Sequence, residues 1–242
     1  MTVDMHVFSG DGPDARERWN RRWSERGVCP LQRAPAQWLV ENARMLPGAA
    51  GRRALDVACG DGRNAVYLAR LGFAVDACDV SDVAIDGLRA AAREAGLAIN
   101  ATRMDLEREP LPTDRYDVVV QINYLQRALS GSLVATLAFG GILVAETFTR
   151  AHVERLGGRL DERFLLRPGE LLTACSPLRL LRYREGITGS PDRRKAVASL
   201  VSQRPARSPA TARTAVPPIA GTAVPPIAGT AVPPIAAAAP HR

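Results

Sequence analysis

The chain has 242 residues, of which 46% are hydrophobic and 24% charged, a balance typical of a globular protein with one sizeable domain. Its formal charge is +7, but seven of its 32 basic residues and none of its 25 acidic residues lie after Asp192. Residues 1–192 are therefore neutral as a whole. This distribution argues against a nucleic-acid partner.

The two ends of the chain differ in composition from the middle. Residues 1–12 lack periodicity and an apolar signal segment, and we expect a flexible arm there. Residues 205–242 contain the repeat TAVPPIAG, whose Pro-Pro pairs predict a disordered tail. One folded domain is expected over residues 13–204. Four cysteines without metal-type spacing and the lack of a long apolar run predict a metal-free, cytoplasmic protein with no membrane partner.

Helical patterns come first along the chain. Trp19 and Trp23 lie four residues apart in a charged stretch that predicts a helix from residue 13, and their rings would either pack on the domain or cover a cofactor. A second helix is expected over residues 35–46. An apolar strand then ends on Asp56, a turn carries Gly60 and Gly62, and a helix opens near Arg63.

The remaining elements alternate between strands and helices until the last pair. We expect six further strands, at residues 73–79, 97–104, 116–122, 141–147, 178–184 and 195–203, and helices at residues 82–94, 125–138 and 168–174, the first capped by Ser81. The loop over residues 185–194 is too short for a crossover helix, so the last two strands should be antiparallel. The sequence predicts an α/β fold with a doubly wound, mostly parallel seven-stranded sheet and an antiparallel C-terminal strand pair.

The glycine turn suits two cofactor classes. Residues 60–65 satisfy G-x-G-x-x-A, the dinucleotide fingerprint, and Asp79 stands roughly where that fingerprint expects its ribose-binding acid. However, a carboxylate at Asp56 would repel a pyrophosphate and suits a cationic ligand. Acids also end successive strands at Asp56, Asp79 and Asp105, as recognition of an ammonium, a ribose diol and an adenine amine requires. S-adenosylmethionine is therefore favoured, with an NAD(P)-binding oxidoreductase and a catalytically inactive cofactor-binding module as alternatives.

Several motifs carry a family resemblance: LDVACGDGRNAVYLA, VDACDVS, MDLE, YDVVV, FGGILVAETF and RPGELL. With these, residues 19–205 resemble class I S-adenosylmethionine-dependent methyltransferases related to the tellurite-resistance group, although Ala58 replaces the usual first glycine. The resemblance implies a Rossmann-like fold in which the glycine loop meets the methionine part of the cofactor, Asp79 the ribose, and Asp105 with Leu106 the adenine. The expected cofactor-binding residues are Asp56, Ala58, Gly60, Gly62, Arg63, Asn64, Asp79, Val80, Asp105, Leu106 and Gln121.

Residues after the fourth and fifth strands are expected on the acceptor side. Asn123-Tyr124 lacks the prolines of the Asn-Pro-Pro-Tyr motif of amino-methylating relatives, which favours a small-molecule acceptor over a nucleic acid or protein. The candidate catalytic residues are Glu146, His152 and Tyr124, although a base is needed only if the acceptor must lose a proton. Residues 186–189 replace a His-Arg pair of tellurite-type relatives, which makes tellurite a doubtful substrate. A monomer or weak homo-oligomer is expected.

Overall fold

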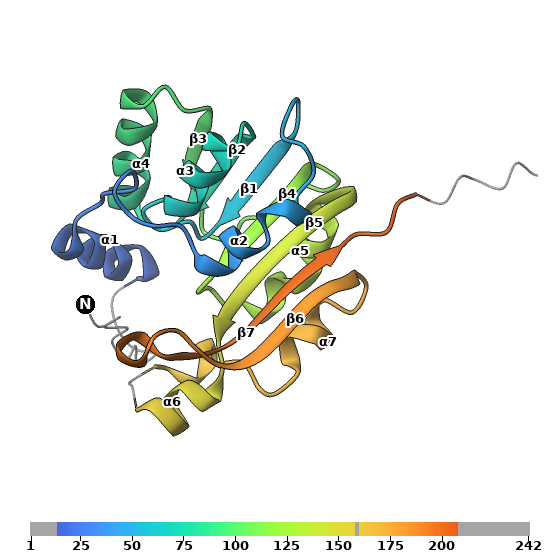
Figure 1. Ribbon diagram of the computed structural model, residues 1–242. Coiled ribbons are helices and arrows are strands. Elements are labelled where there is room, and N and C mark those ends of the chain that lie inside the picture. The colour runs from blue at the N-terminus through green and yellow to red at the C-terminus, as the bar shows by residue number, and fades with distance from the viewer. Residues whose placement is uncertain (1–13, 158–159, 208–242) are drawn as a thin grey trace, which may run out of the picture. The chain divides into compact units, whose positions relative to one another are not determined.

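The computed structural model describes residues 14–157 and 160–207, and the predicted arm and repeat tail lie outside the described residues apart from residues 205–207. A seven-stranded sheet forms the centre, with the strand order β3-β2-β1-β4-β5-β7-β6 (Figure 1). The strands are β1 (Arg53–Val57), β2 (Ala74–Asp79), β3 (Ile99–Arg103), β4 (Tyr116–Ile122), β5 (Leu137–Phe148), β6 (Arg179–Thr188) and β7 (Lys195–Gln203). The helices are α1 (Ala15–Arg26), α2 (Gln37–Glu41), α3 (Arg63–Arg70), α4 (Asp82–Glu94), α5 (Ser130–Thr136), α6 (Arg150–Leu156) and α7 (Glu170–Ala174).

The pairing of the strands confirms the predicted fold class. β3, β2, β1, β4 and β5 are mutually parallel, whereas β7 runs antiparallel to both β5 and β6. The carboxyl ends of the parallel strands therefore meet at one edge, and the strand order reverses between β1 and β4. Ligands of open α/β sheets bind at such a reversal.

Side chains of alternate strand residues build two hydrophobic clusters, one on each face of the sheet. In β4, Val118 and Val120 belong to the cluster that contains Trp38 of α2 and Leu88 of α4. Val119 belongs to the cluster on the other face, together with residues of α5 and α7. The three valines and the isoleucine of β4 are buried, and they point to both faces of the sheet, which explains the continuous apolar run of this strand.

Several predicted boundaries were wrong because tertiary contacts override local pattern. The second helix is interrupted at Asn42, whose Nδ2 donates to the Trp38 carbonyl at 2.7 Å, and continues as a 3-10 turn, Ala43–Met45. The helix after β4 begins as a 3-10 turn, Arg127–Leu129, before α5. The first four residues of the loop predicted over residues 185–194 are strand, because β6 pairs with β7 as far as Thr188. Helix α6 was not predicted.

Neither a membrane span nor a metal cluster occurs in the part of the chain described. Within residues 14–157 and 160–207, no helix has both the length and the apolar character needed to cross a bilayer. The same residues contain no group of three or more His, Cys, Asp or Glu side chains placed to hold a metal ion.

Candidate cofactor and acceptor sites

The turn between β1 and α3 has left-handed backbone at three positions. Gly60 has φ +56° and Gly62 has φ +83°, and Ala58 adopts φ +51° although it carries a Cβ. Gly62 is also the N-cap of α3 and has no side chain to offer the helix. A Cβ on Gly62 would lie 2.4 Å from the Leu88 methyl groups, so this glycine also permits the close packing of α4.

Asp56 supplies the cap that Gly62 lacks. Its Oδ2 accepts from the Ala65 amide at 3.0 Å, so the carboxyl group lies at the N-terminus of α3. The residue is only 1% exposed, and burial raises the pKa of its carboxyl group to about 7, despite the opposing effects of the Ala65 amide and Arg63. Asp56 thus lies beneath the glycine turn, where its charge is sensitive to pH near neutrality.

Asp79 ends β2 directly beside the same turn. Its two carboxylate oxygens accept from the Gly60 and Ser81 amides, each at 2.9 Å, and burial raises its pKa. Each carboxylate oxygen has a second lone pair, so these bonds leave acceptor capacity for a ligand. Asp56 and Asp79, 23 positions apart in the sequence, thus both support the glycine turn.

Trp23 of α1 covers the turn. A Cβ added to Gly60 would lie 2.6 Å from Cζ2 of the Trp23 ring, so the glycine lies directly against the indole. The ring is 7% exposed, and its Nε1 has no hydrogen-bond partner among the described residues. The guanidinium groups of Arg26 and Arg33 lie 5.7 and 5.6 Å from the ring centre. Arg33 Nε also lies 3.0 Å from Asp61 Oδ2 in the turn. The ring therefore packs on the domain at the glycine turn, and contact with the cofactor stays a prediction.

The other expected cofactor residues divide into two groups. The first group lies after β3: Asp105 Oδ1 accepts from the Glu107 amide, and Leu106 is buried. The Met104 amide donates to the Asp79 carbonyl at the end of β2, and this bond keeps the segment beside Val80. Arg63 and Asn64 instead hold the segment before α2. Asn64 Oδ1 accepts from the Ala36 amide at 2.9 Å, and Arg63 donates to the Ala34 carbonyl at 3.4 Å.

A small cavity lies at the carboxyl edge beyond β4 and β5. Its walls are mostly apolar, with Gln121, Tyr124 and Arg127 from the segment after β4 and Leu166 and Leu171 from the segment after β5. Gln121 Nε2 donates to the Tyr124 carbonyl at 3.1 Å and so fixes the bend after β4. Burial, followed by the charges of Glu107, Asp105 and Asp79 and the Cys78 thiol, raises the pKa of Tyr124. Tyr124 therefore lines this cavity and lies within range of the charges of the strand-end acids.

Arg127 closes the outer wall of the cavity. Its Nε and Nη2 lie 2.5 and 3.0 Å from the two carboxylate oxygens of Glu170. The same guanidinium group donates to the carbonyls of Arg163 and Leu165 at 2.7 and 2.9 Å. A bidentate pair with two further bonds fixes a side chain well, so Arg127 ties the segment after β4 to α7.

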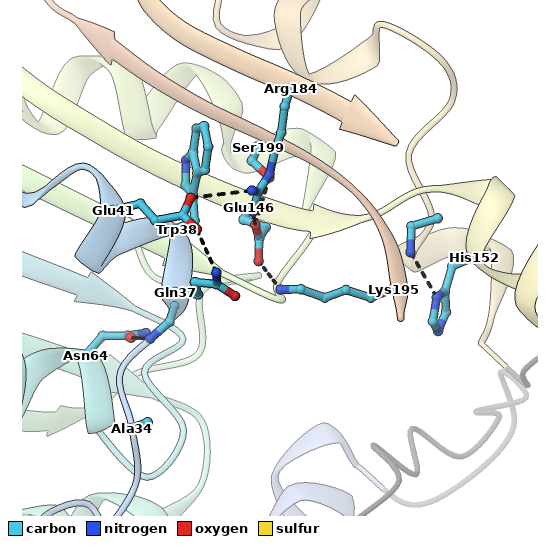
Figure 2. A network of polar contacts seen from close by, with 12 residues as sticks. Ala34, Gln37, Trp38, Glu41, Asn64, Glu146, His152, Arg184, Lys195 and Ser199 are labelled. Atoms are coloured by element: carbon cyan, nitrogen blue, oxygen red, sulfur yellow. Dashed lines mark hydrogen bonds and ion pairs between the residues drawn. The ribbon is translucent and has the colours of Figure 1, made fainter. Parts of the chain in front are cut away.

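The candidate bases Glu146 and His152 are both engaged by other groups. Figure 2 shows Glu146 among Lys195, Arg184 and Ser199, and its side chain is fully buried. Burial would raise the pKa of Glu146, but the nearby Lys195, Ser199 and Arg184 together hold it below the usual value. His152 accepts from the Ala196 amide through Nδ1 and lies against Phe148, and burial and Lys195 lower its pKa. Tyr124 and Glu146 are among the residues that line the cavity, and His152 is not. The Glu146 carboxylate, however, lies on the other face of the sheet, the face of Val144 and Ile142.

Known proteins are similar to this chain in sequence and in architecture. A family model described as a methyltransferase domain matches residues 54–138. The chain is 30% identical over 165 residues to a ubiquinone biosynthesis O-methyltransferase from Shewanella pealeana. This match covers 60% of this chain and 70% of that protein. The chain belongs to the class I S-adenosylmethionine-dependent methyltransferases. Its cofactor is therefore S-adenosylmethionine and not NAD(P), the two cofactors with which the sequence of the glycine turn is compatible.

Two further similarities cover different shares of this methyltransferase. An S-adenosyl-L-methionine-dependent Diels-Alderase from Talaromyces variabilis is 32% identical over 110 residues. The match covers 44% of the methyltransferase but only 38% of the length of that relative. The solved structure of TehB from Haemophilus influenzae superposes with a TM-score of 0.59 at 18% identity, covering 77% of this chain and 67% of that one. At this identity the structural likeness shows a shared fold.

The cofactor-binding residues predicted for this methyltransferase from its sequence did not include Trp23. The four-residue spacing of Trp19 and Trp23 was the available signal.

The backbone strain at Ala58 leads to a stability prediction. A left-handed residue with a Cβ costs about 1–2 kcal/mol, part of which glycine recovers despite its larger entropy loss on folding. We expect Ala58→Gly to raise the free energy of unfolding by about 1 kcal/mol in urea denaturation. Ala54→Gly in β1 is the matched control and should lower it, since Ala54 is a buried strand residue. Equal destabilisation by both changes would contradict the strain at Ala58.

Proposed function

We propose that the protein is an enzyme that transfers a methyl group from S-adenosylmethionine to a small-molecule acceptor. One observation supports the proposal: Tyr124 lines the cavity beyond β4 and β5 and also lies within range of the charges of Asp79 and Asp105 at the neighbouring strand ends. The cavity measures about 30 Å³, so its mostly apolar walls suit a small apolar part of an acceptor. A cytoplasmic location and a monomeric or weakly oligomeric state stay predictions from the sequence.

The residues around the turn fit this cofactor. Asp79 keeps acceptor capacity for two ribose hydroxyl groups, and Asp56 offers a negative charge near an ammonium group. Trp23 Nε1, which has no hydrogen-bond partner among the described residues, is a buried donor, and the guanidinium groups of Arg26 and Arg33 lie near its ring, a setting that suits a carboxylate. We assign the turn with Asp56, Asp79 and Trp23 to the amino-acid and ribose parts, and Asp105 with Leu106 to the adenine. When bound, the cofactor supplies an electrophilic methyl group on a sulfonium.

The chain's own contribution is orientation and exclusion of water. Trp23 closes the turn from one side, and the Arg127–Glu170 pair holds the wall of the acceptor cavity on the other. Fixing two reactants in a near-attack geometry lowers a barrier by about 7–11 kcal/mol. Glu146 is held as an ion by its partners and the His152 Nδ1 is occupied, which favours an acceptor that needs no strong base from these residues.

Calorimetric titration with S-adenosylhomocysteine and, separately, NADH tests the cofactor assignment. We expect micromolar binding of S-adenosylhomocysteine and none of NADH. Release of S-adenosylhomocysteine from S-adenosylmethionine with a panel of small acceptors then tests for an enzyme against an inactive binding module. Binding of NADH alone would contradict the cofactor assignment, and cofactor binding without turnover over a broad panel would contradict the enzyme.

A further inference from the structure

Helix α1 contacts the cofactor edge through a second residue besides Trp23. Asn20 precedes Trp23 by three positions and therefore lies on the same face of the helix. Its Oδ1 accepts from the Ser81 hydroxyl at 2.8 Å and from the Val83 amide at 3.3 Å, and its Nδ2 donates to Asp82 Oδ2 at 3.2 Å. These three partners surround the N-terminus of α4, beside which α1 packs (Figure 1). Helix α1 thus contacts the loop after β2 as well as the glycine turn.

The neighbours of Asn20 fix the orientation of its amide group. The Val83 N–H can only donate and the ionised Asp82 carboxylate can only accept, so the oxygen of Asn20 faces Val83 and its nitrogen faces Asp82. The Ser81 hydroxyl lies beside the same oxygen and has a single hydrogen, which it donates to Asn20. The direction of the Ser81 hydroxyl therefore follows from the presence of an asparagine in α1.

Ser81 links Asn20 to the Asp79 carboxylate. Ser81 is fully buried, and its Oγ accepts from the Ala84 amide at 3.2 Å as the N-cap of α4. Its own amide donates to Asp79 Oδ1 at 2.9 Å, while Asp79 Oδ2 accepts from the Gly60 amide. A displacement of Ser81 would therefore move one of the two bonds that orient this carboxylate.

Attachment of α1 to the domain is a separate role, which Arg16 illustrates. Arg16 Nε pairs with Asp82 Oδ2 at 2.5 Å, but the Arg16 side chain is 51% exposed. Exposed ion pairs contribute little to stability because water screens them. Arg16 thus shares a partner with Asn20, whereas the bond to the Ser81 hydroxyl belongs to Asn20. Substitutions at these two residues can separate attachment of the helix from orientation of Asp79.

We propose that Asn20 is a positioning residue for the cofactor: through Ser81 it holds the Asp79 carboxylate in the orientation that accepts from the ribose hydroxyl groups. This inference rests on the proposed function, which assigns Asp79 to the ribose. Hydrogen bonds depend on the direction of the acceptor, so a carboxylate that is free to turn binds a diol less well. On the same face of α1, Trp23 packs against Gly60, whose amide donates to the other oxygen of Asp79. Recognition of the ribose therefore depends on α1 through two residues.

Ligands with and without ribose hydroxyl groups test this role. Calorimetry of the full chain compares S-adenosylhomocysteine with its analogue that lacks both ribose hydroxyl groups, and the ratio of the two affinities measures what the hydroxyl groups contribute. We expect a ratio of about 100 or more for the unaltered protein and a ratio close to one for Asp79→Ala, because hydrogen bonds to a charged group are among the strong ones. Asn20→Ala should lower the ratio by about fivefold or more, mainly through weaker binding of S-adenosylhomocysteine.

Arg16→Ala is the matched control, since it removes a partner of Asp82 from the same helix. It should leave the ratio unchanged. A merely structural role of Asn20 would weaken both ligands equally and leave the ratio of Asn20→Ala at its original value. That result would overturn the proposal.

A double variant separates an effect through Asp79 from an independent one. If Asn20 acts through Asp79, adding Asn20→Ala to Asp79→Ala should have little further effect on the affinity for S-adenosylhomocysteine. If Asp79→Ala fails to fold, Ser81→Ala is the second background, because it removes the hydroxyl group that Asn20 holds and keeps the amide that donates to Asp79. Losses that add in full would contradict the proposal.

The same titrations distinguish this inference from the proposed function. Absence of S-adenosylhomocysteine binding by the unaltered protein would overturn both. A ratio that persists in Asp79→Ala would overturn the ribose assignment and, with it, the role of Asn20. A ratio that is lost in Asp79→Ala but persists in Asn20→Ala would overturn the role of Asn20 alone.

Discussion

Replacing Asp79 by alanine is expected to weaken binding of S-adenosylhomocysteine by about 100-fold or more, because the two charge-assisted hydrogen bonds that we assign to the ribose would be lost at about 1.5–3 kcal/mol each. The substitution also leaves the Gly60 and Ser81 amides without their acceptor, which loosens the glycine turn itself. Calorimetry of the variant measures the affinity, and urea denaturation measures the accompanying loss of stability.

The control for Asp79 lies on the same strand. Asp76 is partly buried and pairs with Arg53 at 2.7 Å and with the Tyr116 hydroxyl at 2.8 Å, away from the turn. Asp76→Ala should destabilise the fold without a comparable change in cofactor affinity. If the two variants lose the same affinity, the effect at Asp79 is one of general stability and its assignment to the ribose is wrong.

Asp56→Asn is expected to change the pH dependence of cofactor affinity. The buried carboxyl group of Asp56 has a pKa of about 7, so raising the pH from 6 to 8 ionises it and strengthens binding of the cationic amino group by about tenfold. Asparagine keeps an oxygen for the Ala65 amide but has no charge, so the variant should bind more weakly at pH 8 and show a flat profile. Calorimetric titrations across this range make the measurement.

The stability of the free protein should change with pH in the opposite direction. The pKa of Asp56 is raised on folding, so between about 4 and 7 the folded state holds a proton that the unfolded state has released. Stability therefore falls as the pH rises through this range, and Asp56→Asn removes that fall.

Asp61→Ala is the control within the turn and should reduce cofactor affinity less than Asp56→Ala does. The reverse order would contradict the role given to Asp56.

The strands and the cofactor edge were predictable because their signals are local. Continuous apolar runs such as β4 and the glycine turn before α3 reflect burial and backbone conformation at those residues. Ser81 caps α4 as predicted, with its Oγ accepting from the Ala84 amide at 3.2 Å. The positions of Asp56, Asp79 and Asp105 at strand ends then placed them at one edge once the strands were parallel.

The remaining features depend on contacts between distant parts of the chain. Trp23 meets Gly60 only when α1 packs on the domain, and Glu146 finds Ser199 and Lys195 only because β7 pairs antiparallel with β5. The break at Asn42 likewise involves Arg182, 140 positions away, which donates to Asn42 Oδ1 at 2.9 Å. The residue spacing within one segment does not indicate these long-range contacts, so neither hydrophobic periodicity nor sequence motifs predict them.

The residues assigned to the cofactor and those that line the acceptor cavity come from different segments of the chain, so each set can be mutated separately. The residues assigned to the cofactor precede β4, whereas Leu166, Leu171 and Cys175 of the cavity wall come from the connection between β5 and β6. That connection can be exchanged or mutated for a new acceptor while the turn beneath Trp23 is left intact. Residues 160–178 are therefore the segment at which directed evolution of acceptor choice should begin.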